Sequence, residues 1–145
     1  MLKGVSQMTR FSARLVTDSR NLLLQNSFVE GSILRIRMHN FLTYMDAEVR
    51  PGPDLNMLIG PNGNGKSAVA CALAIGLGFP LKVLGRADKL KSFVNNKSDE
   101  NEAWVELELR GKLGDPNVTI RRTFSSEDDR SSFRLNGTSL FAFYM

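Results

Sequence analysis

The chain has 145 residues, enough for one domain with its own core but few for an elaborate nucleotide hydrolase. Its net charge of +4, from 19 basic and 15 acidic residues, is compatible with nucleic-acid contact without requiring it. One cysteine and one histidine exclude an internal disulfide and zinc or other metal sites built on these residue types, and no apolar run approaches the ~18 residues of a membrane span.

Residues 1–30 differ in composition from the rest of the chain. They contain four basic residues, two acidic residues and scattered serines, with no clear strand period. We expect a flexible N-terminal extension. An Arg-rich, Ser-rich, acid-poor start is also typical of organellar transit peptides, and the spacing of Phe11, Leu15 and Leu22 would allow one amphipathic helix. Residues 31–145 are expected to form a single lobe.

Three predicted strands and one predicted turn precede the most informative motif. Residues 33–38 alternate apolar and basic side chains, which predicts a half-buried strand. Residues 44–49 are a second strand candidate, and residues 51–54, which read PGPD, predict a turn. Residues 55–59 are almost continuously apolar and predict a strand that is buried on both faces.

Residues 60–67 read GPNGNGKS, a complete G-x-x-x-x-G-K-[ST] phosphate loop between the apolar run and an Ala-rich helical run. The glycines let successive backbone N–H groups point at phosphate oxygens, and the helix adds its positive end. Lys66 is expected to reach the β- and γ-phosphates, and the Ser67 hydroxyl is expected to hold Mg²⁺. The motif predicts nucleoside triphosphate binding.

The helix that follows the loop is predicted over residues 67–77. It is apolar all round, which favours a central position, and Cys71 within it is expected to be a buried thiol. Gly76, Gly78 and Pro80 are expected to end it.

The C-terminal third is predicted to be antiparallel β structure. Residues 104–110 and 118–124 both alternate in polarity and form a hairpin candidate across residues 111–117. Asn136 and Gly137 predict a type I′ turn. The fold class is therefore α/β, a mixed sheet with antiparallel strands at both ends and one buried helix behind the phosphate loop.

Residues 96–99 spell N-K-S-D, which matches the guanine-selecting motif of GTPases. The motif lies in a polar loop without the apolar strand that should precede it, so we interpret it as ordinary loop composition. A Walker-B acid at the end of an apolar strand is also missing, because Asp99, Glu100, Asp128 and Asp129 all occupy polar stretches. The sequence carries the triphosphate cradle without a catalytic acid.

Beyond these patterns, residues 31–94 resemble the N-terminal head segment of the structural maintenance of chromosomes (SMC) ATPases. An I-x-x-I-x-x-x-N-F opening matches Ile33, Ile36, Asn40 and Phe41. The PGP at residues 51–53, the LGLG-like residues 75–78 and the LGRA at residues 84–87 are most similar to the fifth eukaryotic member, which partners the sixth in a DNA-repair complex. Asn64 departs from the more usual Thr or Ser, which should leave the backbone cradle intact.

The resemblance implies an ABC-type ATPase head divided between two distant segments of one long chain. The N-terminal segment carries the phosphate loop, and the C-terminal segment carries the signature motif and Walker B. The implied ligands are ATP and Mg²⁺, and the chain is expected to be inactive alone. The implied nucleotide-binding residues are Asn62, Gly63, Asn64, Gly65, Lys66, Ser67 and Arg86, with Ser67 as metal ligand. For Arg86 the alternative is a surface arginine that follows a turn.

The resemblance also implies several partners: the C-terminal half of the head, the sixth SMC member, non-SMC subunits and DNA, in the nucleus and on chromosomes. No membrane partner is expected. The charges themselves suggest where DNA would bind: Arg35 and Arg37 alternate out of the first strand, and Lys82, Arg86, Lys89 and Lys91 cluster after the phosphate-loop helix. These residues are expected either to make nonspecific contacts with DNA phosphates or to be ordinary solvated charges. Two alternatives are a head fragment of another ABC-type DNA-repair protein, such as RecN or Rad-type relatives, and a non-catalytic interaction module with a vestigial loop.

Overall fold

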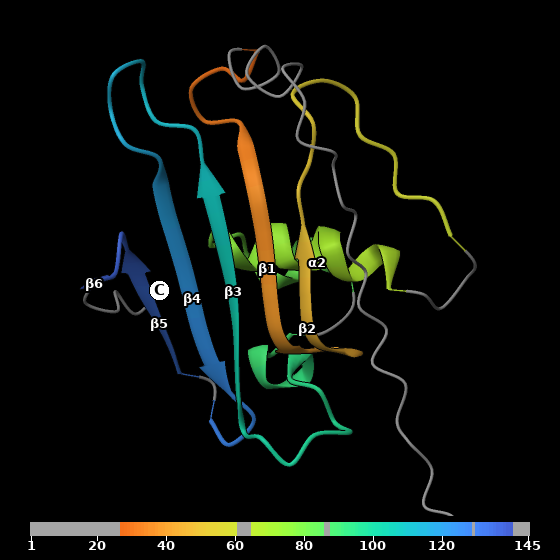
Figure 1. Ribbon diagram of the computed structural model, residues 1–145. Helices are drawn as coiled ribbons and strands as arrows, with labels where there is room; N and C mark the ends of the chain where they lie inside the picture. The colour runs from red at the N-terminus through yellow and green to blue at the C-terminus, as the bar shows by residue number, and fades with distance from the viewer. Residues whose placement is uncertain (1–26, 61–64, 86–87, 129, 141–145) are drawn as a thin grey trace, which may run out of the picture.

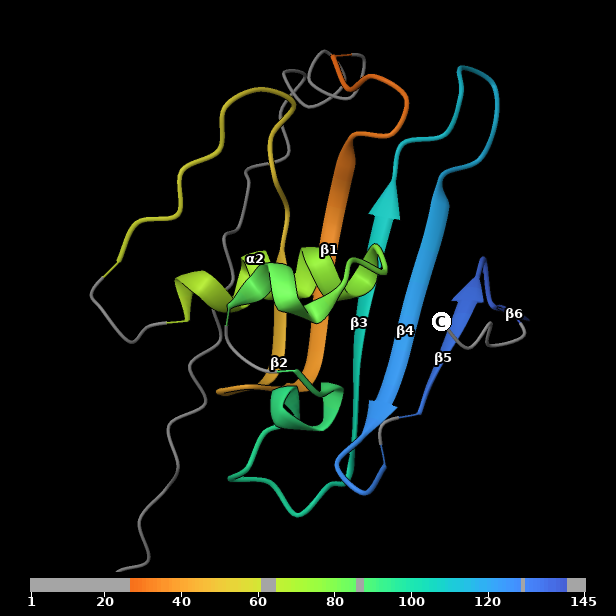
Figure 2. The same cartoon turned by 180° about the vertical axis from the view of Figure 1, so that it is seen from behind.

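The computed structural model describes residues 27–60, 65–85, 88–128 and 130–140. In these ranges, a six-stranded antiparallel sheet in the order β2-β1-β3-β4-β5-β6 carries one α-helix on one face (Figures 1 and 2). The strands are β1 (Ile33–Phe41), β2 (Tyr44–Val49), β3 (Glu102–Leu109), β4 (Val118–Ser125), β5 (Ser131–Leu135) and β6 (Thr138–Leu140). Most of the expected extension, residues 1–26, lies outside the described residues.

The strand predictions from alternating polarity are confirmed. In β1, Ile36 and Met38 are buried against the helix, while Arg35 and Arg37 lie on the opposite, outer face of the sheet. The expected hairpin is the β3–β4 pair, in which Leu107 lies opposite Ile120.

The turn between β5 and β6 has the predicted type I′ geometry. Asn136 has φ 49° and Gly137 has φ 81°, so both central residues are left-handed. The Asn136 side chain also accepts a hydrogen bond from the Thr119 backbone N–H at 2.7 Å, which ties this turn to β4.

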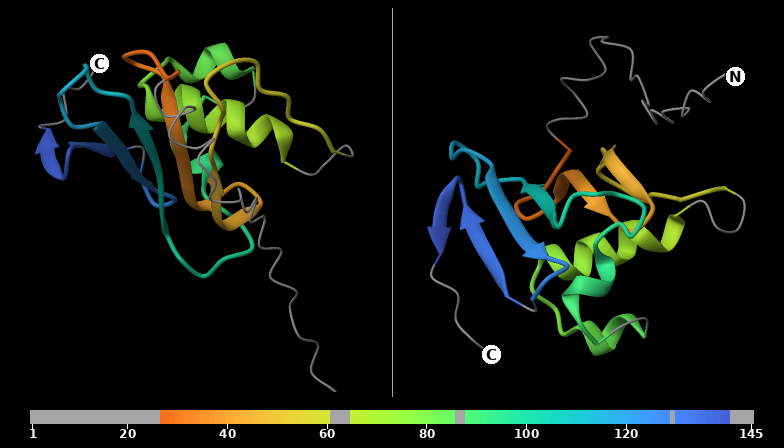
Figure 3. Two further views of the ribbon diagram at one scale, coloured as in Figure 1. Left: turned by 45° about the horizontal axis from the view of Figure 1, so that its top comes forward. Right: turned by 90° about the horizontal axis from the view of Figure 1, so that it is seen from below.

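The helix α2 (Lys66–Gly76) lies across β1, β3 and β4, and the short 3₁₀ helices η1 (Leu81–Leu84) and η2 (Leu90–Phe93) follow it (Figure 3). Together α2, η2 and the inner face of the sheet enclose the core. Its buried apolar residues are Ile36, Met38, Phe41, Ala68, Val69, Cys71, Ala72, Ile75, Leu90, Phe93, Val94, Ala103, Val105, Leu107 and Phe124.

Two predictions about burial are wrong. The helix is not surrounded by protein: Ala70 is exposed and Leu73 and Ala74 are only half-buried, because α2 packs on one face of a single sheet. Residues 55–59 do not form a strand, and Leu55 and Ile59 are 88% and 82% exposed. A strand buried on both faces needs neighbours on both sides, and no described strand pairs with this segment, which loops away from the sheet (Figure 1).

Arg122 fastens the end of α2 to the sheet. Its Nη1 donates to the Ile75 carbonyl at 3.2 Å, its Nε and Nη2 contact the Ser131 hydroxyl, and its guanidinium stacks on Phe133. A cation at the C-terminal end of a helix is favourable because it meets the negative end of the helix dipole. Burial lowers the pKa of Arg122, which nevertheless stays charged.

Among the described residues, no helix combines the length and apolar character needed to cross a bilayer.

Candidate nucleotide-binding site

The site begins where the phosphate loop becomes α2. Gly65 is the N-cap residue, in a left-handed conformation with φ 76° and ψ 13°, and the Ala68 N–H donates to its carbonyl at 2.8 Å. No side chain caps this helix end, and its first turn has no acidic residue. An uncapped helix start directs N–H donors and a positive dipole end outward, which suits an anion.

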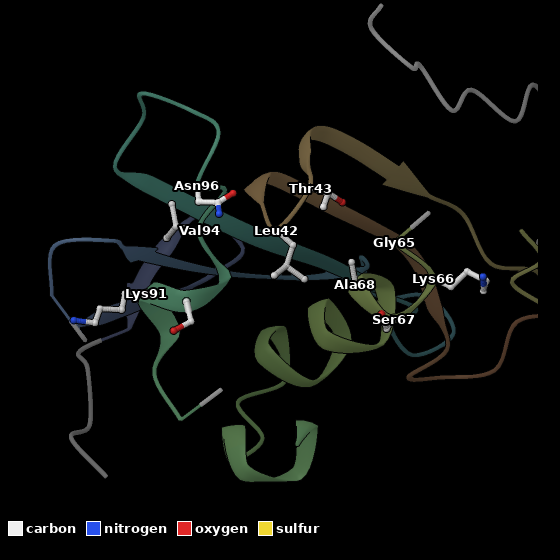
Figure 4. Close-up of a pocket in the computed structure, with 10 residues that line it drawn as sticks. Leu42, Thr43, Gly65, Lys66, Ser67, Ala68, Lys91, Val94 and Asn96 are labelled. Carbon is white, nitrogen blue, oxygen red and sulfur yellow. The ribbon is translucent and has the colours of Figure 1, made fainter. Parts of the chain in front are cut away.

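A cavity of about 670 Å³ lies beside this helix start (Figure 4). Three segments that are distant in the sequence form its walls: the start of α2, the β1–β2 turn, and η2 with the loop after it. The lining residues are Leu42, Thr43, Gly65, Lys66, Ser67, Ala68, Lys91, Ser92, Val94 and Asn96. The volume is in the range of sites that hold small molecules and cofactors.

Three of the predicted site residues, Gly65, Lys66 and Ser67, lie together on the cavity wall. The Lys66 Nζ donates to the Gly60 carbonyl at 2.6 Å and so bridges the two ends of the loop. Ser67 is exposed, which leaves its hydroxyl accessible to a metal ion. Asn62, Gly63, Asn64 and Arg86 lie outside the described residues.

Sequence reasoning missed the other two walls of the cavity. Leu42 and Thr43 carry no nucleotide-binding signal of their own, and the N-K-S-D match that begins at Asn96 is explained by loop composition. In the structure residues 96–99 form turns and bends, with no strand leading into them, as the loop interpretation predicts. These residues come near Ser67 only in the folded chain, where the β1–β2 turn and η2 line the same cavity as the start of α2.

The part of the chain that the structure describes places no acidic side chain at the cavity. None of the described lining residues is acidic. Glu100 hydrogen-bonds to His39, and Asp128 pairs with Arg130 at 2.8 Å. These carboxylates are engaged elsewhere, in agreement with their assignment to polar loops.

The predicted DNA patch is divided between two surfaces of the molecule. On the outer face of the sheet, Arg35 pairs with Glu108 at 2.9 Å and Arg37 pairs with Glu106 at 3.2 Å. Lys91 instead lines the cavity on the α2 side. The two arginines and Lys91 therefore lie on different faces, because alternation in β1 turns the arginines away from α2.

Comparison with known proteins gives the family. The sequence model of the AAA domain matches residues 35–141. The structural maintenance of chromosomes protein 5 of Schizosaccharomyces pombe is 46% identical over 113 residues, which are 78% of this chain and 10% of that protein. The chain thus spans about a tenth of the length of this relative.

Solved structures agree at the level of the fold. A structure from work on ATP-driven dimerization and DNA-stimulated activation of SMC ATPases superposes with TM-score 0.66 at 23% identity, covering 74% of this chain and 71% of that one. The ATP complex of the recombination mediator protein RecF gives TM-score 0.65 at 19% identity, covering 79% and 29%. The partial P-loop head of the ABC type is thereby confirmed as the fold, and the chain belongs to the AAA-domain family as an N-terminal ATPase-head segment of the SMC type.

Proposed function

We propose that this chain binds Mg-ATP at the cavity beside α2, as the phosphate-loop half of an SMC-type ATPase head. The observation that supports this binding most directly is the start of α2. It has no side-chain cap and follows Gly65 in a left-handed conformation, and Lys66 and Ser67 lie there on the cavity wall. Backbone N–H groups and the Lys66 ammonium would neutralise phosphate charge. ATP is the nucleotide named for the structurally similar SMC and RecF proteins.

The residues present fit a magnesium ion. Mg²⁺ prefers oxygen ligands and commonly takes only one or two from the protein, with the rest from phosphates and water. The exposed Ser67 hydroxyl is one such oxygen. When bound, the ion would neutralise phosphate charge. Because no described lining residue is acidic, the second protein ligand would come from another segment.

Replacing Lys66 tests nucleotide binding. Lys66→Ala removes a charge-assisted contact, so Mg-ATP affinity in calorimetric titration should fall by about 10- to 150-fold. Lys112→Ala, which removes an exposed lysine between β3 and β4, is the matched control and should leave affinity unchanged. Affinity that is indifferent to Lys66 would favour a vestigial loop and sink the proposal.

Hydrolysis should require a partner segment. Because none of the described residues that line the cavity is acidic, the isolated chain should turn over ATP no faster than background. We propose that the C-terminal half of an SMC head supplies the acid and the signature motif. Turnover by the purified chain that depends on Lys66 would contradict this division of the site.

The wider assembly follows from similarity to the fifth SMC member. We propose a place in a DNA-repair or chromosome-maintenance complex, in the nucleus and on chromosomes, with the sixth SMC member and non-SMC subunits as partners. RecF shares the fold, but at 19% identity against 46% for the SMC relative it is a weaker guide to partners.

DNA is the proposed substrate of this assembly, held by nonspecific phosphate contacts. The exposed lysines Lys82, Lys89 and Lys91 follow α2, and they are the candidate surface because Arg35 and Arg37 lie on the outer face of the sheet. Charge reversal of all three lysines should abolish a gel shift at low salt in the absence of nucleotide. An unchanged shift would remove this surface from the account.

A further inference from the structure

The β1–β2 turn is strained and firmly held. Asn40 and Leu42 have φ 49° and 53°, a left-handed conformation that non-glycine residues seldom adopt and that tends to occur at functional sites. The fully buried Asn40 amide donates to the carbonyls of Glu100 and Glu102 at 2.8 and 2.9 Å. The Leu42 N–H donates to the Phe93 carbonyl at 2.8 Å.

These bonds fix the turn relative to the rest of the cavity. Phe93 ends η2, so the bond from Leu42 joins the β1–β2 turn to the segment that forms the opposite wall. Tyr44, the first residue of β2 after the turn, pairs with Phe41, the last residue of β1. The turn therefore delivers the Tyr44 side chain to a defined position next to α2.

The Tyr44 phenol lies against Gly65. A Cβ built on Gly65 would be 2.6 Å from both Cε2 and Cζ of Tyr44, and closer still to its hydroxyl oxygen. The ring thus fills the space that a side chain at position 65 would need. Glycine is required here twice, for its φ of 76° and for the approach of the ring.

We propose that Tyr44 is a positioning residue of the phosphate loop, an inference that rests on the proposed nucleotide binding. Tyr44 is not among the residues that line the cavity, so it acts through Gly65. Its ring blocks the movement of Gly65 out of the left-handed conformation and keeps the N–H groups at the start of α2 directed at the cavity. The same turn places Thr43 on the cavity wall.

The first experiment compares three variants of the 145-residue chain by calorimetric titration with Mg-ATP and by thermal melting without nucleotide. Tyr44→Ala should weaken binding about tenfold, whereas Tyr44→Phe, which keeps Cε2 and Cζ, should stay within about twofold of the unmodified chain. Phe79→Ala, which removes a half-exposed aromatic ring after α2, should leave affinity unchanged. Loss of affinity in Tyr44→Phe equal to that in Tyr44→Ala would overturn the packing argument.

The second experiment measures whether substitutions at Tyr44 and Gly65 have coupled effects on Mg-ATP affinity and on melting temperature. Gly65→Ala should abolish most binding alone, and its effect should be smaller in the Tyr44→Ala background, where the collision is removed. Additive effects on both affinity and melting temperature would overturn the proposal. If the unmodified chain does not bind Mg-ATP, the proposed function fails, and coupling in melting temperature then still decides whether Tyr44 holds Gly65 in place.

Discussion

His39 is held between two carboxylates on the outer face of the sheet. Its Nδ1 contacts Asp46 of β2 and its Nε2 contacts Glu100 of the loop before β3, both at 2.8 Å, and its ring stacks on Trp104. Partial burial lowers the pKa of His39, but hydrogen bonds to the two carboxylates and their charge outweigh burial and raise it above its ordinary value. The ring thus joins β1 to two neighbouring segments, and its raised pKa favours the protonated form that can donate to both carboxylates.

The raised pKa predicts stability that depends on pH. A group with a higher pKa in the folded state stabilises the fold fully below its unfolded pKa of about 6.5, and this contribution is lost as pH rises through the folded pKa. The free energy of unfolding should therefore decrease as the pH rises from about 6.5 through the higher pKa of His39 in the folded state. Because His39 is the only histidine, the difference between the unmodified chain and His39→Gln isolates its effect.

Denaturant titrations at a series of pH values measure this difference. Asp46→Asn and Glu100→Gln should each reduce the pH dependence, because each removes one carboxylate from the ring. Identical pH profiles for His39→Gln and the unmodified chain would contradict the assignment.

At the scale of elements, the contact between α2 and β3 is close-packed at Gly76, the last residue of the helix. A Cβ on Gly76 would lie 2.8 Å from Cδ1 and 2.9 Å from Cγ of Leu107, and 3.3 Å from Cγ1 of Val105. Both partners are fully buried and have little room to move. The helix approaches the sheet this closely because position 76 has no side chain.

Gly76→Ala should therefore destabilise the fold although alanine favours helix formation. Overpacking costs about 1–3 kcal/mol and the helix preference returns at most about 1 kcal/mol, so a net loss of about 1 kcal/mol is expected in chemical denaturation. Gly52→Ala is the control, since its added Cβ would meet only the Asn56 amide oxygen at 3.6 Å. A Gly76→Ala protein as stable as this control would show that α2 is loosely packed.

At the scale of the whole molecule, a single sheet that is covered on one face by α2 leaves apolar surface exposed to solvent. Residues 55–59 expose Leu55, Met57, Leu58 and Ile59, and the outer side of α2 is also uncovered in the part of the chain that the structure describes. Surfaces of this kind commonly mark interfaces or sites of aggregation. We infer that a further head segment covers them and supplies the missing strand neighbours of residues 55–59.

Co-expression tests this inference. The chain alone should be poorly soluble, and a C-terminal SMC head segment should rescue it as a stable complex. Met57→Lys with Ile59→Lys should improve solubility alone and abolish the complex, whereas Leu113→Lys, at a 98% exposed position between β3 and β4, should affect neither. A monodisperse monomer whose solubility does not change on co-expression with the C-terminal segment would count against a half-domain.

Local patterns in the sequence determined much of the fold and part of the site. Alternation predicted β1, β3 and β4, the Asn136-Gly137 pair predicted its turn, and the phosphate loop predicted the start of α2. Each signal lies within a few adjacent residues, where steric preference and the period of the backbone act directly. The roles of Lys66 and Ser67 follow from such a pattern and stay predictions.

Contacts between distant segments were decided by the tertiary structure alone. His39 and Glu100 are 61 positions apart, and their meeting depends on how the loop before β3 folds back over β1. The contact between the Tyr44 ring and Gly65 depends on a strained turn that no local sequence pattern predicts. Residues 55–59 show the converse, because an apolar run favours a strand, yet a strand forms only where neighbouring backbone accepts its hydrogen bonds.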